Sequence, residues 1–415
     1  MRNKITGTGF ILLMTLLLFG CSDDAQQSPA AGESAVPEAL KHILLDQPSS
    51  LPPKAAKKEE QSRPLKIGVL GPETGPGSGS DYGLSVLAGA KLAAKYINDH
   101  GGIDGKEVEL LHFDDKEDLQ LTQQGVKEFI AQDVIAILAA PTGWSTFAPT
   151  RQVNQAHTLL FSIGSRRRIG RSGPYVLRAA LPTELATEAL IKYAVEEFGF
   201  KNYALVSSSL YDYSLDLSAS FKMALLNNGA VIQVDADTYD TYTGQKDYRK
   251  IIEAINSSTD IQAVVFTGEV AEAIIIAKGL AEKGLSLPIL GGEDLFTPEF
   301  LAAEKSVQGS LVYSAFAPDN KSSQAVEFMQ AHGNGTPDRF EALAYDSFLF
   351  LTEAIKAAGN TKPTEIREAL FTLKSFEGAT GAMSFSPEDG IVKAPFIHRV
   401  ESGSKGMEFV LVSPQ

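Results

Sequence analysis

Cysteine is nearly absent from this chain, because Cys21 is the only one among its 415 residues. A folded region without a second cysteine forms no internal disulfide, so its stability must come from an apolar core. The composition supplies one: 44% of the residues are hydrophobic, and a folded region of roughly 350 residues buries about three quarters of its extended surface. We expect a region of this length to form two lobes.

Motifs that carry catalysis are also missing. The six histidines are scattered, with no two at the spacing that puts a pair of metal ligands on one helix face. There is no GxSxG elbow, P-loop or CxxC motif, and the glycines of residues 71–79 lack the spacing of a dinucleotide-binding turn. The adjacent acids at 114–115 and 293–294 are typical of strand ends and caps. We therefore predict no enzyme activity, no catalytic residues, no metal and no cofactor.

Positive charge is scarce as well. The sequence holds 37 Lys and Arg against 51 Asp and Glu, which gives a formal net charge of −14. Nucleic acids and anionic lipid surfaces attract basic proteins, so neither is expected as a general partner of this chain.

The N-terminus carries a short apolar run, residues 10–19, behind two basic residues. Such a segment is typical of a secretion signal and is too short to span a bilayer as a finished anchor. Residues 18–21, Leu-Phe-Gly-Cys, resemble the lipobox of bacterial lipoproteins. The resemblance implies a signal peptide over residues 1–20, a lipid attached to Cys21, and a location on the periplasmic side of a bacterial membrane, inner or outer. An uncleaved signal anchor is the alternative, and it too places most of the chain outside the cytoplasm.

Residues 21–63 are rich in Ala, Ser, Gln, Pro and charged side chains, with too few apolar residues to bury a face. We predict a flexible tether over this range. A short apolar patch, residues 39–45, could form a brief helix, but it is too short to be stable alone.

From Pro64 onward, short β-branched runs alternate with longer amphipathic stretches, which is the pattern of parallel βαβ units. The first predicted strand covers residues 65–71, and the helix after it, residues 82–100, ends at a glycine pair that can cap it. Further strands are predicted at 108–113, 134–138, 158–162, 175–178, 203–207, 230–235, 263–267, 288–290 and 311–314. Further helices are predicted at 121–132, 144–156, 183–198, 214–228, 247–255, 270–283, 322–332, 340–358 and 363–373. Such folds bind ligands at the carboxyl ends of their strands.

Several blocks of sequence carry a resemblance to a known family. They are IGVLGPETGP at 67–76, GGIDGK at 101–106, GGE at 291–293 and AYD at 344–346. Together they resemble the periplasmic branched-chain amino-acid-binding proteins, the type I solute-binding proteins of ABC transporters, and the likeness covers residues 65–412. It implies an α/β chain with the type I periplasmic-binding-protein fold, in which two doubly wound parallel-sheet lobes are joined by a three-crossing hinge.

The resemblance also implies where the lobes begin and end. The hinge crossings are expected near Leu181, Ser314 and Ser386. They divide the chain into an N-terminal lobe of residues 64–181 and 315–386 and a C-terminal lobe of residues 182–314 and 387–415. We expect a monomer.

In the family, the ligand carboxylate is held by main-chain amides and a hydroxyl just after the third strand, here residues 141–145. The expected serine falls at Gly143, with Thr142 and Ser145 as nearby hydroxyls that could replace it. A helix start favours an anion, because its first N–H groups are unpaired. The lone tryptophan, Trp144, either walls the pocket or packs at the helix start. Glu293 falls where the family places the acid that pairs with the ligand ammonium, and its alternative is a solvated turn acid.

The second group of site residues includes two departures from the family. Tyr82 and Tyr213 match the cleft tyrosines of the two lobes, whereas Arg166 lies in a basic run and Glu269 stands where a tyrosine is typical. An arginine near the cleft either binds a second acidic group of the ligand through a hydrogen-bond fork or belongs to a solvated loop that balances local acids. The predicted ligand-binding residues are Tyr82, Thr142, Gly143, Trp144, Gly164, Arg166, Tyr213, Glu269 and Glu293.

Together, the N-terminal segment and the family resemblance predict a lipid-anchored solute-binding protein. We expect it to close two lobes on a small-molecule ligand, an amino acid or a related carboxylate. Its expected partner is an ABC-transporter permease. The rival hypothesis is a non-transport lipoprotein that uses the same fold as an interaction module, resembling activators of peptidoglycan synthases or a sensor subunit. Branched-chain specificity is not implied, because of the departures at Arg166 and Glu269.

Overall fold

The structure is a computed structural model of the whole chain, and it describes residues 63–75, 79–240, 242–387 and 390–413. The predicted signal peptide, the lipid-attachment residue Cys21 and nearly all of the predicted tether lie outside the described residues. The described residues belong to one compact unit, and their strands form two larger and two smaller sheets.

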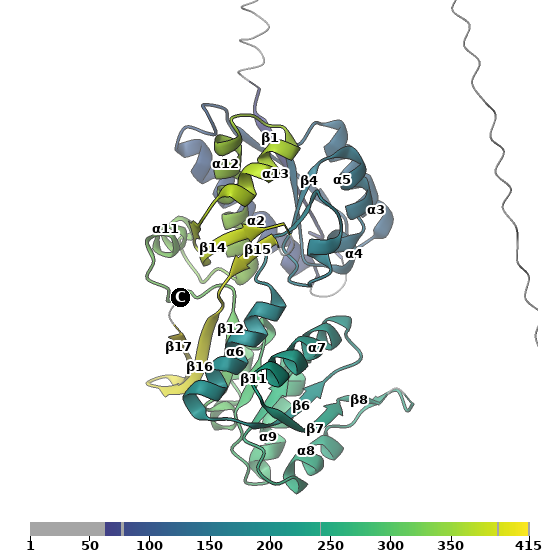
Figure 1. Cartoon of the computed structure of the whole chain (residues 1–415), viewed down its shortest axis with the longest axis vertical. Coiled ribbons are helices and arrows are strands. Elements are labelled where there is room, and N and C mark those ends of the chain that lie inside the picture. Colours follow the sequence, from purple (N-terminus) through teal and green to yellow (C-terminus); the bar gives the residue numbers. More distant parts are fainter. Residues whose placement is uncertain (1–62, 76–78, 241, 388–389, 414–415) are drawn as a thin grey trace, which may run out of the picture. The chain divides into compact units, whose positions relative to one another are not determined.

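The first sheet has five parallel strands in the order β2-β1-β3-β4-β5. They are β1 (Leu65–Gly71), β2 (Val108–Asp114), β3 (Ala136–Ala139), β4 (Leu159–Ser162) and β5 (Val176–Arg178). Every residue of β3 and β4 is buried, because central strands of a parallel sheet are covered on both faces. Helices α2 (Gly79–Asp99) and α12 (Arg339–Ala358) pack on one face, and α3 (Leu119–Ala131) and α5 (Thr150–Ala156) on the other (Figure 1).

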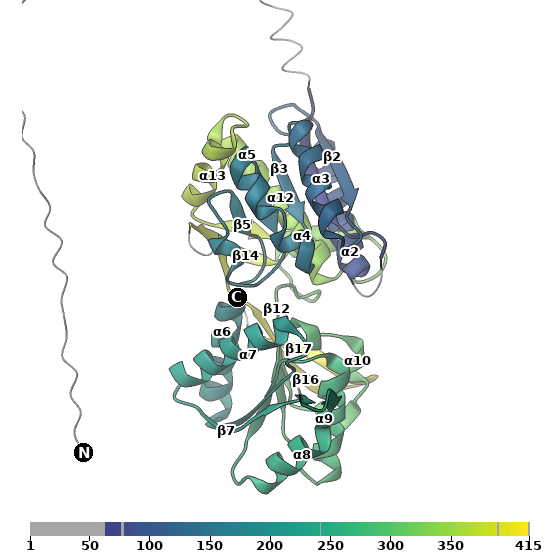
Figure 2. The ribbon, with the colours of Figure 1, turned by 90° about the vertical axis from the view of Figure 1, so that its right-hand side faces the viewer.

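The second sheet has seven strands in the order β17-β16-β12-β11-β10-β6-β7. Five are parallel: β6 (Asn202–Ser207), β7 (Val231–Asp237), β10 (Ala263–Phe266), β11 (Ile289–Gly291) and β12 (Leu311–Ser314). At the edge, β16 (Phe396–Gly403) pairs antiparallel with β12, and β17 (Gly406–Ser413) pairs antiparallel with β16. Helices α6 (Thr183–Phe198) and α7 (Asp212–Asn227) cover one face, and α8 (Tyr248–Ser257) and α9 (Val270–Glu282) the other (Figure 2). Both lobes are therefore doubly wound, as predicted.

The chain reaches its second lobe and returns through short crossings. β5 ends at Arg178 before α6 begins, and β12 ends at Ser314. The third crossing lies after Ser386. An antiparallel sheet of β13 (Phe376–Gly378), β14 (Gly381–Ser386) and β15 (Gly390–Lys393) continues past Ser386. Because β15 still pairs with β14, the chain passes to the seven-stranded sheet between Lys393 and Phe396.

The remaining elements connect these layers. They are α4 (Gly143–Phe147), η2 (Ile169–Arg171), β8 (Tyr239–Asp240), β9 (Gln245–Lys246), η3 (Glu293–Leu295), α10 (Pro298–Leu301), η4 (Glu304–Val307), α11 (Ser323–His332) and α13 (Pro363–Thr372). The single helix predicted over residues 144–156 is divided into α4 and α5, because Pro149 has no N–H to continue the hydrogen-bond ladder. The sequence also failed to predict β13 to β17.

Helix α12 has a well-defined start, which matters for the site below. Asp338 is the N-cap, and its carboxylate accepts from the N–H groups of Phe340 and Glu341. The Glu341 carboxylate accepts from the Asp338 N–H in return at 3.0 Å, completing a capping box. The hydroxyl of Ser85, on α2, donates to Asp338 at 2.6 Å. These contacts fix Arg339, the first residue of the helix.

Candidate functional site: a cavity between the two lobes

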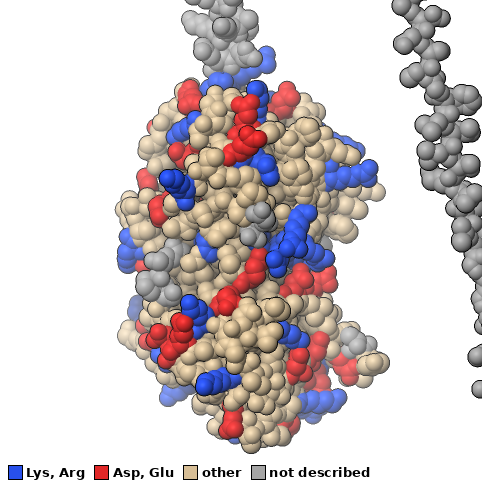
Figure 3. Space-filling view, viewed as in Figure 1, with Lys and Arg blue, Asp and Glu red and all other residues tan. Residues whose placement is uncertain are grey.

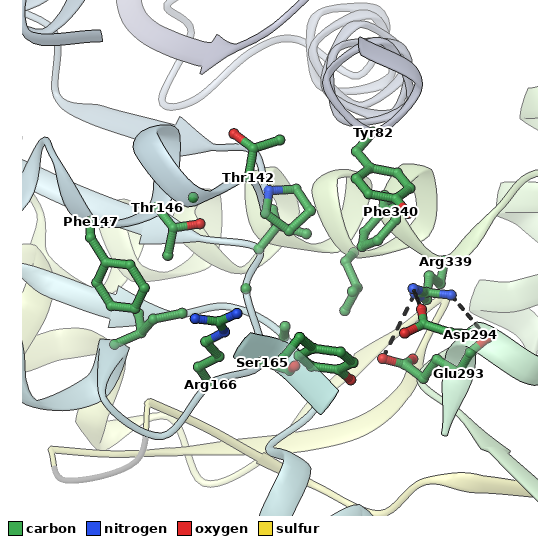
Figure 4. A pocket seen from close by; sticks show the side chains of 18 residues that line it. Tyr82, Thr142, Thr146, Phe147, Ser165, Arg166, Glu293, Asp294, Arg339 and Phe340 are labelled. Atoms are coloured by element: carbon green, nitrogen blue, oxygen red, sulfur yellow. Dashed lines mark hydrogen bonds and ion pairs between the residues drawn. The ribbon is translucent and has the colours of Figure 1, made fainter. Parts of the chain in front are cut away.

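A cavity of about 240 Å³ lies at the carboxyl ends of the strands. Its lining residues come from both lobes, that of the five-stranded sheet and that of the seven-stranded sheet. Seven of the nine predicted ligand-binding residues line it: Tyr82, Thr142, Gly143, Gly164, Arg166, Tyr213 and Glu293. Sequence reasoning missed several other lining residues, of which the polar ones are Thr146, Ser165, Asp294 and Arg339. Figure 4 shows Arg166 on one side of the cavity, and Glu293, Asp294 and Arg339 together on the other.

Glu293 is a buried acid at the end of β11, in the short helix η3. Its Oε1 accepts from the main-chain N–H of Ala315 at 2.7 Å, and Ala315 directly follows β12 in the hinge. Its Oε2 lies 3.8 Å from Nε of Arg339. Burial raises the pKa of Glu293 above its ordinary value, although the positive charge of Arg339 opposes the shift. The site therefore holds a carboxylate that is costly to ionise unless a cation lies beside it.

Arg339 brings the N-terminal lobe into contact with this acid. Its guanidinium donates to the main-chain carbonyl of Glu293 at 3.0 Å and to Oδ1 of Asp294 at 2.6 Å. It also stacks over the ring of Phe340, 4.5 Å from the ring centroid, and Phe340 packs against Tyr82 with 4.9 Å between centroids. Two acids and one arginine thus line this side of the cavity, and the buried Lys393 is a further positive neighbour of Glu293.

Tyr213 is the second residue of α7 and lines the cavity from the second lobe, near Glu293 and Asp294. Burial and the nearby carboxylates of Asp294 and Glu293 raise the pKa of Tyr213. Its phenol therefore stays protonated at neutral pH and can donate a hydrogen bond to a ligand.

The predicted anion-binding corner lies where β3 leads into α4. Thr142 is the N-cap of α4, but its hydroxyl donates to Ser145 at 2.9 Å and accepts no hydrogen bond from the N–H groups of the helix start. Ser145 in turn donates to the buried carboxylate of Asp115, which also accepts from Thr122 at 2.9 Å. The hydroxyl of Ser145 is therefore used inside the lobe, and Thr142 and Gly143 are the members of this corner that line the cavity.

Two predicted residues lie away from the cavity lining. Trp144 follows Gly143, but its side chain is 49% exposed. Glu269 is an exposed N-cap residue of α9, and its main-chain N–H donates to the carboxylate of Glu272 at 3.3 Å. A helix cap explains why an acid occupies that position, since carboxylates accept from the free N–H groups of a helix start.

The basic loop after β4, residues 165–168, is bound by a buried arginine, Arg178. Arg178 donates to the main-chain carbonyl of Ser165 at 3.0 Å and pairs with Glu184 through two hydrogen bonds of 2.9 Å and 3.1 Å. Although burial opposes the shift, Arg178 holds the pKa of Glu184 below its ordinary value. The carbonyl contact fixes the position of the loop at the residue before Arg166.

Neither a metal site nor a membrane span is found in the part of the chain that the structure describes. No group of three or more His, Cys, Asp and Glu side chains there could hold a metal ion. No described helix is both long enough and apolar enough to cross a bilayer.

Comparison with known proteins identifies the family. The sequence profile of the periplasmic binding proteins matches residues 64–403. The chain is a member of the periplasmic binding protein family. It is 27% identical to the Leu/Ile/Val-binding protein BraC3 of Rhizobium johnstonii, over 82% of this chain and 92% of that protein.

Solved structures agree with the fold. The branched-chain amino acid transporter substrate-binding protein LivJ of Streptococcus pneumoniae, determined in complex with isoleucine, is 26% identical, with a TM-score of 0.68. The alignment covers 84% of this chain and 100% of LivJ. The leucine-binding protein LivK of Thermotoga maritima is 21% identical, with a TM-score of 0.67 over 84% of this chain and 99% of LivK. The type I fold expected from the sequence is thereby confirmed.

Proposed function

We propose that this periplasmic binding protein captures an amino acid or a related small carboxylate between its lobes and delivers it to the permease of an ABC importer. The observation that carries the proposal is the position of Glu293, a buried acid that faces a cavity lined from both lobes. Oε1 of Glu293 accepts one main-chain hydrogen bond, and Oε2 is 3.8 Å from its nearest cationic nitrogen on Arg339. A ligand ammonium beside Oε2 would offset the remaining negative charge.

The names of the relatives support this ligand class, since BraC3 is a Leu/Ile/Val-binding protein and LivJ was determined with isoleucine. Family membership also supports binding rather than catalysis, because BraC3 is named as a binding protein and LivJ as the substrate-binding protein of a transporter. The mechanism is closure. A ligand that contacts both lobes favours the closed arrangement, and the permease then recognises the closed form.

We further propose that a lipid on Cys21 holds the protein at the periplasmic side of a membrane. We also propose that the chain divides into an N-terminal and a C-terminal lobe at three hinge crossings. Attachment would be tested by mass spectrometry of the protein from membranes, in which Cys21→Ser should lose the mass of the lipid and appear in the soluble fraction. A Cys21→Ser protein that stays in the membrane fraction would contradict the lipid anchor.

The ligand is tested by thermal shift of the purified full chain, freed of carried-over ligand, against amino acids, dicarboxylates and cell-wall peptides. A ligand at a hundred times its dissociation constant adds about 2.7 kcal/mol of stability, a shift of several degrees. Glu293→Gln should lose the shift, whereas Glu299→Gln, at an exposed acid of α10 outside the cavity lining, should keep it. No shift with any compound would favour the protein-interaction hypothesis instead.

A further inference from the structure

A second cavity of about 160 Å³ adjoins the first, and Arg166 and Tyr213 line both of them. The charged residues that line the second cavity are Arg166, Arg167, Arg168, Glu184 and Asp216. Three arginines against two acids make this cavity different in charge from the Glu293 side of the first.

The two acids balance the arginines only in part. Glu184 already forms two hydrogen bonds with the buried Arg178. Asp216, on α7, is then the acid that faces Arg166 and Arg168, and its Oδ2 lies 3.7 Å from Nε of Arg166 and 3.5 Å from a terminal nitrogen of Arg168. Charge-assisted hydrogen bonds are shorter, about 2.7–2.9 Å. Both guanidinium groups are therefore loosely paired and keep donors for another anion.

The hydrogen-bond donors of Arg166 lie on the opposite side of the first cavity from Glu293. In Figure 4 the guanidinium of Arg166 lies across the first cavity from Glu293 and Arg339. In the space-filling view, a group of basic side chains lies directly above a group of acidic ones where the lobes meet, on the side of α4 and α7 (Figure 3). The cavity is thus acidic on one side and basic on the other, and the basic side opens toward the second cavity.

We propose that Arg166, supported by Arg168, binds a second carboxylate of the ligand, so that the protein prefers an acidic amino acid over a neutral one of the same shape. The inference rests on the proposed function, because it assumes that Glu293 and the corner at Thr142 and Gly143 hold the α-amino acid group. The arginine fork matches the two oxygens of a carboxylate. The side chain of Arg166 is 24% exposed, which leaves it within reach of a ligand but screened from bulk water.

The test compares L-glutamate with L-glutamine, which have nearly the same shape and differ in side-chain charge. Equilibrium dialysis of the purified full chain with each radiolabelled amino acid should give an affinity for glutamate about tenfold or more above that for glutamine, the ratio expected for one charge-assisted contact. Arg166→Gln should remove this preference, because it should lower the affinity for glutamate about tenfold more than the affinity for glutamine. Arg168→Gln should reduce it in part. Arg171→Gln, at an exposed arginine of the same loop that lines neither cavity, is the matched control and should keep it.

Several results would overturn the inference. Equal affinity for glutamate and glutamine in the unaltered protein would do so without any variant. So would a glutamate preference that survives in Arg166→Gln and in the double variant with Arg168→Gln. Tight binding of L-leucine with no binding of glutamate would reject the acidic subsite and leave the proposed function intact. No binding of any amino acid or dicarboxylate would reject the proposed function as well.

Discussion

Arg339 donates a hydrogen bond of 3.0 Å to the main-chain carbonyl of Glu293, 46 residues away in the sequence and in the other lobe. The same guanidinium bonds to Asp294 at 2.6 Å. One arginine therefore joins the start of α12 to the end of β11 and occupies part of the acidic side of the ligand cavity. The contact joins the two lobes at the charged side of the cavity.

Loss of this arginine should destabilise the protein. Arg339→Gln removes two hydrogen bonds to the second lobe and leaves Glu293 buried without its cation, so we expect the free energy of unfolding to fall by about 1–3 kcal/mol. Lys356→Gln, on the same helix, breaks only an exposed pair with Glu353 and should cost about 0.5 kcal/mol or less. Urea titrations of the two variants make the comparison. Equal losses would show that Arg339 is no more than a surface charge.

Ligand binding should weaken in mild acid. Burial raises the pKa of Glu293, with Arg339, Asp294 and Lys393 as its charged neighbours, so the carboxyl takes up a proton at a higher pH than a free glutamate. The neutral acid attracts an ammonium less, and the dissociation constant should rise as pH falls through the raised pKa. Binding isotherms between pH 4 and pH 8 (the range is set by a reference pKa of about 4.3 for glutamate) test this. An affinity that does not change until the pH falls below that reference value would contradict it.

Folding stability should show the opposite dependence on this group. Since the pKa of Glu293 is higher in the folded chain than in the unfolded chain, the unfolded chain binds fewer protons between the two values. The contribution of Glu293 is thus fully present below the unfolded pKa and is lost as pH rises through the folded one. Thermal unfolding of Glu293→Gln should lack this component. The difference in melting temperature between the variant and the unaltered protein should therefore change with pH in this window.

The hinge contains a buried lysine that should respond to alkaline pH. Lys393 donates to the carbonyls of Ala315 and Thr380, and burial lowers its pKa to about 8, although Asp346 and Glu293 oppose the shift. Between this value and its ordinary pKa the unfolded chain binds more protons, so the stability contribution should rise with pH. Thermal unfolding from about pH 8 to about pH 9.5, below the ordinary titration of tyrosine, should show this rise, and Lys393→Met should not.

The packing of α2 on α12 leaves no room for a side chain at Gly89. A Cβ atom there would lie 2.1 Å from the main-chain carbonyl oxygen of Glu341. Gly89→Ala should therefore force the two helices apart and cost about 1–3 kcal/mol of unfolding free energy. Lys91→Ala, at an exposed position of the same helix, should be close to neutral. A stable Gly89→Ala protein would show that the helices can separate without cost.

The sequence predicted the alternation of strands and helices because the central strands are short apolar runs bounded by turns. The division into two doubly wound lobes came from the resemblance carried by blocks such as residues 67–76. The C-terminal strands were missed, because β16 and β17 follow the alternating βα units as an antiparallel edge pair, with polar side chains such as Ser402 and Glu408 exposed.

Only part of the lining of the cavity could be predicted from the sequence. Residues at strand ends, such as Thr142 and Glu293, could be located because the carboxyl ends of strands meet in one place. Arg339 could not, since its partner lies far away in the sequence. The one available signal was the pattern of Asp338 and Glu341, which marks the start of a helix but does not show where the arginine points. Trp144 was placed near the site by sequence adjacency, although its side chain turns out to be largely exposed.

The most direct test of the account is isothermal titration of the ligand-free full chain with L-amino acids, repeated on Glu293→Gln. We predict one binding site per chain, with an affinity at least about tenfold lower in the variant, because a charged contact to the ligand ammonium is lost. The same affinity in both proteins would show that Glu293 does not hold the ligand. An absence of heat with every amino acid would contradict amino-acid binding itself.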